Sequence, residues 1–356
     1  MLQLEPKRVI GERLRRQRLL TPIECPEDER EYLELFGLLQ PVAPVHNTRP
    51  GDPPRLVHRT LFHDDGLAGK LRERNAIIKG RFCGGRIGYV LQEDLERYAV
   101  AFRKPLAKAT PIHEDILTVL KTSGGLSKEQ LKQELNGYPA GEISKALQSL
   151  QEAFLVYEHQ PDTDWDTGWF DFATEWFEIE ADGVRCAQAV SEVIRTFIKA
   201  MVFATAAHIK SWSQLPAKAI RQGIASLAEE GKIVAAEVAG LGQGFVCTED
   251  AEGGFPPDIP PCVFMLDKSD FLVRAHMDEL QRRYKGYEVL QFLLIDGEFK
   301  GAVLGHWRIG PYDVEDIRVE LPPDQAEIRR DEILDAVRTV YSPDRHNIVR
   351  YNGKPL

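Results

Sequence analysis

The sequence lacks the features that mark several classes of protein. Its five cysteines are an odd, scattered set without a Cys-X-X-Cys pair, which argues against a disulfide framework and a structural zinc site. Its nine histidines show no spacing of the His-X-X-X-His kind, so we expect no metal and no other cofactor. No apolar signal segment opens the chain, and no apolar run is long enough to cross a membrane. These absences predict a cytoplasmic protein.

The charge of the chain is acidic overall but unevenly distributed. The net charge of −10 argues at first against a nucleic-acid partner. Residues 1–110 nevertheless hold 20 Lys and Arg against 15 Asp and Glu, whereas the remainder holds 25 against 40. A mildly basic segment joined to an acidic body is compatible with a local phosphate-binding face. No heptad stripe suggests a dimer, so we expect a monomer.

The N-terminal part of the sequence predicts helices followed by a hairpin. Helical apolar spacing, a proline-rich stretch and an alternating pattern around Cys-Gly-Gly carry this prediction. The expected elements are helices at 7–20, 26–39, 65–74 and 91–103, a loop at 41–55 and a β-hairpin at 76–90. This order is typical of a winged helix, in which the second or third helix enters the major groove and the hairpin contacts the DNA backbone or minor groove.

The helix-and-hairpin pattern recurs in residues 112–159 and 186–248, and a repeated pattern is stronger evidence than a single copy. Ser127 and Gln130 have the spacing of a capping box. From about residue 256, strand-like runs follow, with Asp296-Gly297 as a hairpin turn. We therefore predict an α+β fold with tandem winged-helix (helix-turn-helix) units at 1–110, 111–183 and 184–250, followed by a C-terminal β-rich domain at 251–356.

Two further patterns have structural explanations. The glycine-rich phrases at 84–88 and 240–244 lack the Lys-Ser/Thr of a phosphate loop, and hairpin turns explain them. Aromatic residues gather at 165–177, where stacking on bases is one reading. Packing against a neighbouring unit is favoured, because several interspersed carboxylates would repel phosphate.

Four passages together resemble a known family. They are RLRRQRLLTP with LFGLLQ (13–22 and 35–40), FCGGRIGYVLQEDLERY (82–98), FIKAMVFATAAHIKSWSQLP (197–216) and FMLDKSDFLV with IDGEFKGAVLGHW (264–273 and 295–307). In order and spacing they resemble the winged-helix DNA glycosylase superfamily of the AlkZ and YcaQ type, which unhooks interstrand crosslinks. The resemblance implies a double-stranded DNA partner and covers nearly the whole chain.

The catalytic motif of that family is only half present. The family has a Gln, an apolar residue and then Gln or Asp, and the matching stretch here is Gln40-Pro41-Val42. The family hairpin commonly reads Arg-Gly-Thr-Leu-His, where this chain has GGRIG at 84–88. Arg49 matches an arginine that follows the motif in the YcaQ branch.

The chemistry implied by the resemblance is hydrolysis of the N-glycosidic bond of an N7-alkylpurine. The cationic base is already a good leaving group, so the enzyme must place a water near C1′ and stabilise a positive sugar. Gln40 is one candidate for holding that water, whereas Val42 has no polar group. His46, Asn47 and Asp52 in the following loop are the candidate substitutes, of which we favour His46 and Asn47.

Three hypotheses remain open from the sequence. The chain is a monofunctional DNA glycosylase, a catalytically silent relative that binds DNA as a regulator or lesion-recognition factor, or a protein-interaction scaffold. Under the first two, basic residues on the predicted helices and hairpin would contact DNA, although charged runs are often only solvated faces. The expected DNA-contacting residues are Arg15, Arg16, Arg49, Lys70, Arg72, Arg74, Lys79, Arg81 and Arg86.

Overall fold

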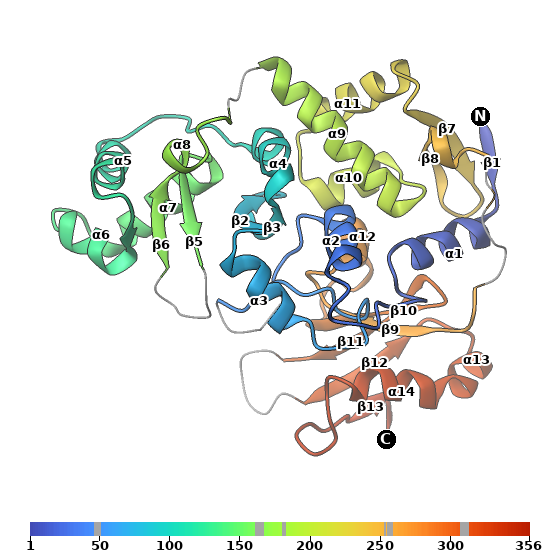
Figure 1. The fold of residues 1–356 in the computed structure, drawn as a ribbon. Helices are drawn as coiled ribbons and strands as arrows, with labels where there is room; N and C mark the ends of the chain where they lie inside the picture. Colours follow the sequence, from blue (N-terminus) through green and yellow to red (C-terminus); the bar gives the residue numbers. More distant parts are fainter. Residues whose placement is uncertain (46–50, 161–166, 180–182, 253, 255–258, 307–312) are drawn as a thin grey trace.

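A computed structural model describes residues 1–45, 51–160, 167–179, 183–252, 254, 259–306 and 313–356 (Figure 1). The fold is α+β, as predicted, with several small sheets and a larger C-terminal one. No described helix has the length and apolar character needed to span a membrane.

The first part of the chain surrounds a two-stranded sheet. Its elements are α2 (Glu29–Leu39), α3 (Asp65–Glu73), β2 (Ile77–Phe82), β3 (Arg86–Leu91), the short η1 (Gln92–Asp94) and α4 (Leu95–Phe102). The hairpin turn at Cys83, Gly84 and Gly85 has positive φ angles throughout, which the two glycines adopt without strain. Val42 extends this sheet by a bridge to Tyr89, with both backbone hydrogen bonds at 2.9 Å.

The second part of the chain consists of helices and a small three-stranded sheet. It contains α5 (Pro111–Ser123), β4 (Leu126–Ser127), α6 (Lys128–Glu134), α7 (Ala140–Glu152), β5 (Val156–His159), β6 (Gly168–Asp171) and α8 (Phe172–Glu175). The strands form a sheet of order β4-β6-β5. The predicted capping box is present, because the Ser127 hydroxyl accepts from the Gln130 N–H and the Gln130 side chain accepts from the Ser127 N–H.

The third part repeats the helices and hairpin and takes in the N-terminus. Its elements are α9 (Gly183–Met201), α10 (Ala206–Ser213), α11 (Ala217–Glu229), β7 (Ile233–Val238), β8 (Gly242–Cys247) and η2 (Thr248–Asp250). Strand β1 (Leu2–Leu4) pairs in parallel with β7, and α1 (Pro6–Arg16) packs near α9 (Figure 1). The first residues of the chain therefore pair with a strand more than two hundred residues away.

The C-terminal part is a six-stranded sheet of order β14-β13-β12-β11-β10-β9. Its elements are β9 (Val263–Leu266), α12 (Phe271–Arg283), β10 (Val289–Ile295), β11 (Glu298–Gly305), β12 (Val314–Val319), α13 (Pro323–Ile328), α14 (Arg330–Arg338), β13 (Arg350–Tyr351) and β14 (Lys354–Pro355). Helix α12 packs against α10 of the third part.

Hydrophobic packing joins most of these parts. One cluster of buried side chains extends along the chain from Ile10 to Leu304 and includes α2, α4, α9, α12 and β10. The second part has a core of its own around Ile116 and Trp169. Of the predicted aromatic segment, Phe170, Phe172 and Trp176 pack with the main cluster, Phe177 is exposed, and Trp165 lies outside the described residues. The division into four units stays a prediction, because the first, third and C-terminal parts share one core.

Gly297, in the turn between β10 and β11, lies tightly against helix α1. Its φ is +80°, and a Cβ there would lie 2.2 Å from Ile10 Cγ2 on α1. We expect Gly297→Ala to lower the unfolding free energy by about 2–4 kcal/mol, from left-handed strain and overpacking together. Urea denaturation would measure this loss. Gly353→Ala, at φ +75° with open space around its Cβ, is the control for strain alone.

Candidate functional site: the motif segment and the basic groove

Gln40 is a buried residue whose side-chain oxygen and nitrogen each bond to another part of the protein. Only 1% of it is exposed, at the end of α2. Its Oε1 accepts from the Leu91 N–H at 2.8 Å, and its Nε2 donates to the Asp94 carboxylate. The Gln40 carbonyl accepts from the Tyr98 hydroxyl. These contacts attach the motif segment to the hairpin and to the start of α4.

A small cavity lies beside the motif segment. Its volume is about 30 Å³, enough for about one water molecule. Val42 and Leu56 contribute apolar walls, while His58 and Asp267 contribute polar ones. One Asp267 oxygen accepts from the backbone N–H and the hydroxyl of Ser269, at 2.8 and 2.6 Å. The cavity therefore brings a fixed carboxylate close to Val42, which has no polar group of its own.

The loop after the motif is held by a buried carboxylate. Asp64 is fully buried and accepts hydrogen bonds from the Tyr32 hydroxyl (3.0 Å), the Leu56 N–H (2.7 Å) and Arg55 Nε (2.9 Å). Burial and the Asp64 charge raise the pKa of Tyr32, so this phenol stays a hydrogen-bond donor. Further along, Arg59 forms a buried ion pair of 2.6 Å with Asp270, which caps α12.

Arg274 on α12 connects three elements at the motif. It is 3% exposed, and its guanidinium donates to the Pro41 carbonyl at 3.1 Å. The same guanidinium lies near Cys83 in the hairpin. Burial raises the pKa of the Cys83 thiol, and the positive charge of Arg274 opposes that rise. Motif segment, hairpin and α12 therefore meet at one buried cation.

An open groove of about 600 Å³ begins at this junction. We call it the basic groove, and it is bounded by Ala43 and Pro44 of the motif segment, Arg86 of β3, and residues of α12 and the α12–β10 turn. Its cationic members are Arg86, Lys268, Arg274 and Lys285. Tyr287 adds an aromatic ring that is 45% exposed and lies under the Arg318 guanidinium, 4.3 Å from its centroid.

Like charges are concentrated in this groove. The pKa of Arg86 is lowered first by partial burial and then by the nearby Arg274 guanidinium. Within the described residues, no hydrogen bond or ion pair joins the Arg86 side chain to a carboxylate. A cluster of cations favours an anionic ligand, and in nucleic acids arginine and lysine bind the anionic phosphates.

A family model described as DNA glycosylase AlkZ-like matches residues 89–321, about two thirds of the chain. The chain belongs to the AlkZ-like DNA glycosylase family. The resemblance predicted from the sequence is thus confirmed, and membership supports roles in DNA binding and DNA repair. The matched range begins at Tyr89, so it does not include the Gln40 motif.

One solved structure extends the likeness to the whole AlkZ-like chain. Streptomyces sahachiroi DNA glycosylase AlkZ is similar over 98% of this chain and 100% of that chain, with a TM-score of 0.68. The sequences are 14% identical, so this comparison shows a common fold. No curated protein matches the sequence. Within the described residues, no group of three or more His, Cys, Asp or Glu side chains is arranged to hold a metal ion.

The predicted DNA-contacting residues of α3 and the hairpin occupy several environments in this AlkZ-like fold. Arg86 and Lys70 are exposed. Arg72 is 4% exposed and donates to the Gly51 carbonyl, and Arg74 pairs with Glu29. Lys79 is bound to Glu158 at 2.8 Å, and Arg81 donates to Gln151 at 2.7 Å. These last two side chains join the hairpin to the second part of the chain.

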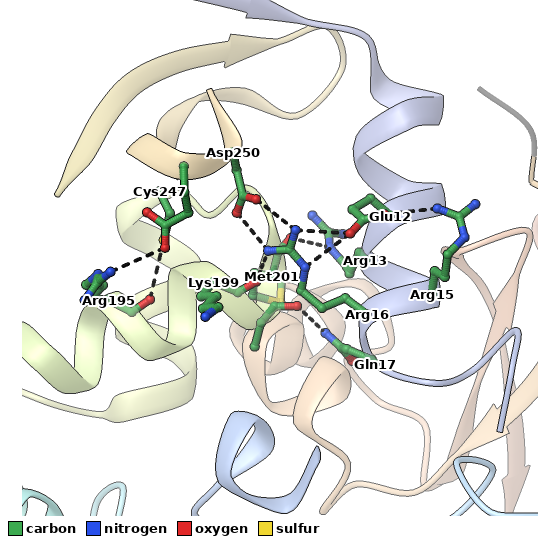
Figure 2. Close-up of polar contacts among 12 residues, drawn as sticks. Glu12, Arg13, Arg15, Arg16, Gln17, Arg195, Lys199, Met201, Cys247 and Asp250 are labelled. Carbon is green, nitrogen blue, oxygen red and sulfur yellow. Dashed lines mark hydrogen bonds and ion pairs between the residues drawn. The ribbon is translucent and has the colours of Figure 1, made fainter. Parts of the chain in front are cut away.

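Arg15 and Arg16 both pair with Glu12 on the same helix, and Arg16 also contacts the third part of the chain (Figure 2). Arg16 pairs with Asp250 at 2.8 Å and with Glu12, and it also donates to the Lys199 carbonyl. Arg15 pairs with Glu12. Arg13 and Gln17 donate to the carbonyls of Met201 and Ala200 at the end of α9. The basic face of α1 thus stabilises the C-terminal end of a helix, where cations are favourable.

His46, Asn47 and Arg49 lie outside the described residues. Sequence reasoning missed three groove residues, Lys268, Arg274 and Lys285, because they come from a part of the chain that was assigned only to a terminal domain. The available signal was the density of Lys and Arg along 268–285 within an otherwise acidic half of the chain.

A partly buried histidine pair joins α10 to α12. The rings of His208 and His276 are 4.5 Å apart, near Arg13 and Glu279. Burial first, then the charges of His276 and Arg13, lower the pKa of His208 to about 3, and burial also lowers the pKa of His276. Both rings are therefore neutral in the folded protein at neutral pH.

Acid should destabilise the fold through this pair. Since the folded pKa of His208 is below its unfolded value of about 6.5, its stabilising contribution is complete above pH 6.5 and decreases as the pH falls towards 3. When the pH is lowered from 7 to 5, we expect the unfolding free energy of wild type to fall by about 2 kcal/mol more than that of His208→Gln. Glutamine keeps the capping-box acceptor for the Thr205 N–H. Equal losses in urea titrations of both proteins would contradict this assignment.

Proposed function

We propose that this AlkZ-like chain is a DNA-repair glycosylase that hydrolyses the N-glycosidic bond of bulky N7-alkylpurines or unhooks interstrand crosslinks in double-stranded DNA. The observation that carries the proposal is the basic groove, which begins at the motif segment where the family's catalytic motif is expected. Family membership supports the reaction class.

In this proposal Arg86 and Lys285, the exposed cations of the groove lining, bind phosphates of the duplex, and Lys268 contributes a third, partly buried cation. Backbone contacts of this kind position a duplex without reading its sequence. Tyr287 offers an exposed ring on which an unstacked base or a bulky aromatic adduct can lie. The groove is open, so a large lesion is admitted without complete enclosure of the base.

In this proposal Gln40 is a positioning residue. It holds the segment 41–45 against β3 through Leu91 and Asp94, and it is not among the residues that line the groove. Asp267, in the water-sized cavity beside Val42, supplies a carboxylate, the group that the family motif can have where this chain has Val42. A carboxylate there would stabilise the positive charge that develops on the sugar. The water-positioning roles of His46 and Asn47 stay predictions.

A second candidate is a catalytically silent DNA-binding relative. The engagement of Gln40 and the apolar side chain of Val42 favour it, because neither residue presents the pair of polar groups that the family motif uses. The two candidates share the groove and differ in whether the glycosidic bond is broken.

Comparing wild type with Asp267→Asn separates the candidates. A duplex with a single N7-alkylguanine is incubated with each protein, and abasic sites are counted by alkaline strand cleavage. We expect wild type to form abasic sites and Asp267→Asn to form them at least about tenfold more slowly with unchanged DNA affinity. Binding by wild type without abasic sites would establish the silent relative instead.

A further inference from the structure

A second open cleft lies elsewhere on the molecule and shares no lining residue with the basic groove. It has a volume of about 660 Å³ and lies between α2, the end of β3 with the start of α4, and the segment that follows α8. We call it the acidic cleft. Its size is within the range of sites that bury ligands or several side chains of a partner.

The floor of the acidic cleft is apolar. Leu33 of α2, Leu95 of α4 and Ile179 are partly or fully buried, and Trp176 packs edge-on against Tyr157. Phe177 is different, because 76% of it is exposed at the cleft wall. An exposed phenylalanine beside other apolar side chains is a feature of protein–protein contact sites.

Carboxylates surround this floor. Glu93, Glu96, Glu175 and Glu178 line the cleft and are exposed, and none of the described lining residues is a lysine or arginine. Glu96 forms an exposed ion pair with Arg185 at 3.2 Å. No ion pair within the described residues neutralises Glu93, Glu175 or Glu178. The cleft therefore repels the phosphates of DNA, which separates it from the groove of the proposed function.

We propose that the acidic cleft binds a basic segment of a partner protein, in which lysines or arginines alternate with leucine or phenylalanine anchors. Charge complementarity assigns the positive residues to the glutamate rim, and the apolar floor requires apolar anchors between them. A polyamine satisfies the rim alone, since it has no apolar side chain to place against Phe177. Binding of this partner would leave the basic groove accessible to DNA.

A short fluorescein-labelled peptide of alternating lysine and leucine is the probe, with a glutamate-for-lysine version as the negative control. Binding to the full-length protein is followed by fluorescence anisotropy. We expect Glu93→Lys with Glu178→Lys to weaken binding at least about tenfold, because two attractions become repulsions. Phe177→Ala should weaken it by about the same factor through loss of apolar contact.

The matched control is Glu24→Lys with Glu252→Lys, which changes the net charge equally at exposed glutamates outside the cleft. It should bind the peptide within about twofold of wild type. The proposal is overturned if the two double variants bind the peptide alike, or if Phe177→Ala binds it as tightly as wild type. It is also overturned if spermidine displaces the peptide when both are present at the same concentration of positive charge. Duplex DNA affinity, measured separately, should be the same in all variants, so this test is independent of the glycosylase proposal.

Discussion

Replacing Arg86 and Lys285 together by glutamine should weaken the binding of duplex DNA about tenfold to a hundredfold at about 0.1 M salt. Both side chains line the basic groove and are exposed, so their substitution removes charge without creating a cavity. Each lost phosphate contact should also lower the slope of log affinity against log salt by about one. Anisotropy titrations of a labelled duplex over a range of salt concentrations measure both effects.

The control for this variant is Arg345→Gln with Lys354→Gln, at exposed basic residues of the C-terminal segment outside the groove. It makes the same change in net charge and should keep DNA affinity within about twofold of wild type. A loss as large in the control would mean that DNA responds to overall charge rather than to the groove. An unchanged salt slope in the groove variant would place the phosphates elsewhere.

Asp64→Ala should lower the free energy of unfolding by about 3–5 kcal/mol. The substitution removes a fully buried carboxylate and leaves the Tyr32 hydroxyl, the Leu56 N–H and Arg55 Nε without their acceptor. Because Asp64 holds the loop that follows the motif segment, the variant should also lose activity at temperatures where it remains folded. Guanidinium denaturation followed by circular dichroism gives the loss directly.

Asp64→Asn is the matched variant, since it keeps the volume and one acceptor oxygen. We expect it to lose about 1–3 kcal/mol, less than the alanine variant, because part of the hydrogen bonding is retained. If alanine and asparagine were equally mild, with losses below about 1 kcal/mol, the Asp64 network would not be what fixes the loop.

Local signals in the sequence were sufficient for most helices and hairpins. Helices α2 and α3 lie within the predicted ranges 26–39 and 65–74, and the capping box of α6 and the Asp296-Gly297 turn form as predicted. These features depend on residues within a few positions of one another, so the sequence alone specifies them. Strand β6 was missed, because its pairing with β4 and β5 is what orders it.

The fates of individual polar residues could not be predicted in the same way. Gln40 is engaged by Asp94, 54 positions later, and Arg16 by Asp250, 234 positions later. A basic helix such as α1 looks the same in sequence whether it faces phosphate or the carbonyl end of another helix. Only the packing of α1 near α9 decides between these two environments.

The groove itself combines distant segments. Arg86 comes from a hairpin and Lys285 from the turn after α12, and Arg274 of the same lining donates to the Pro41 carbonyl. The family resemblance identifies the motif from the sequence, whereas the cations beside it come together only in the tertiary structure. Burial of Val42 under the hairpin likewise follows from its bridge to Tyr89 and not from its apolar character alone.

The most direct test of the central claim is a single-turnover count of abasic sites on a duplex that carries one N7-alkylguanine, with an unmodified duplex alongside. We expect wild type to convert the lesion to an abasic site and to leave the unmodified duplex intact, and the Arg86→Gln, Lys285→Gln variant to convert it more slowly. Tight binding of both duplexes with no abasic site would contradict glycosylase activity and leave a DNA-binding protein with the fold of its family.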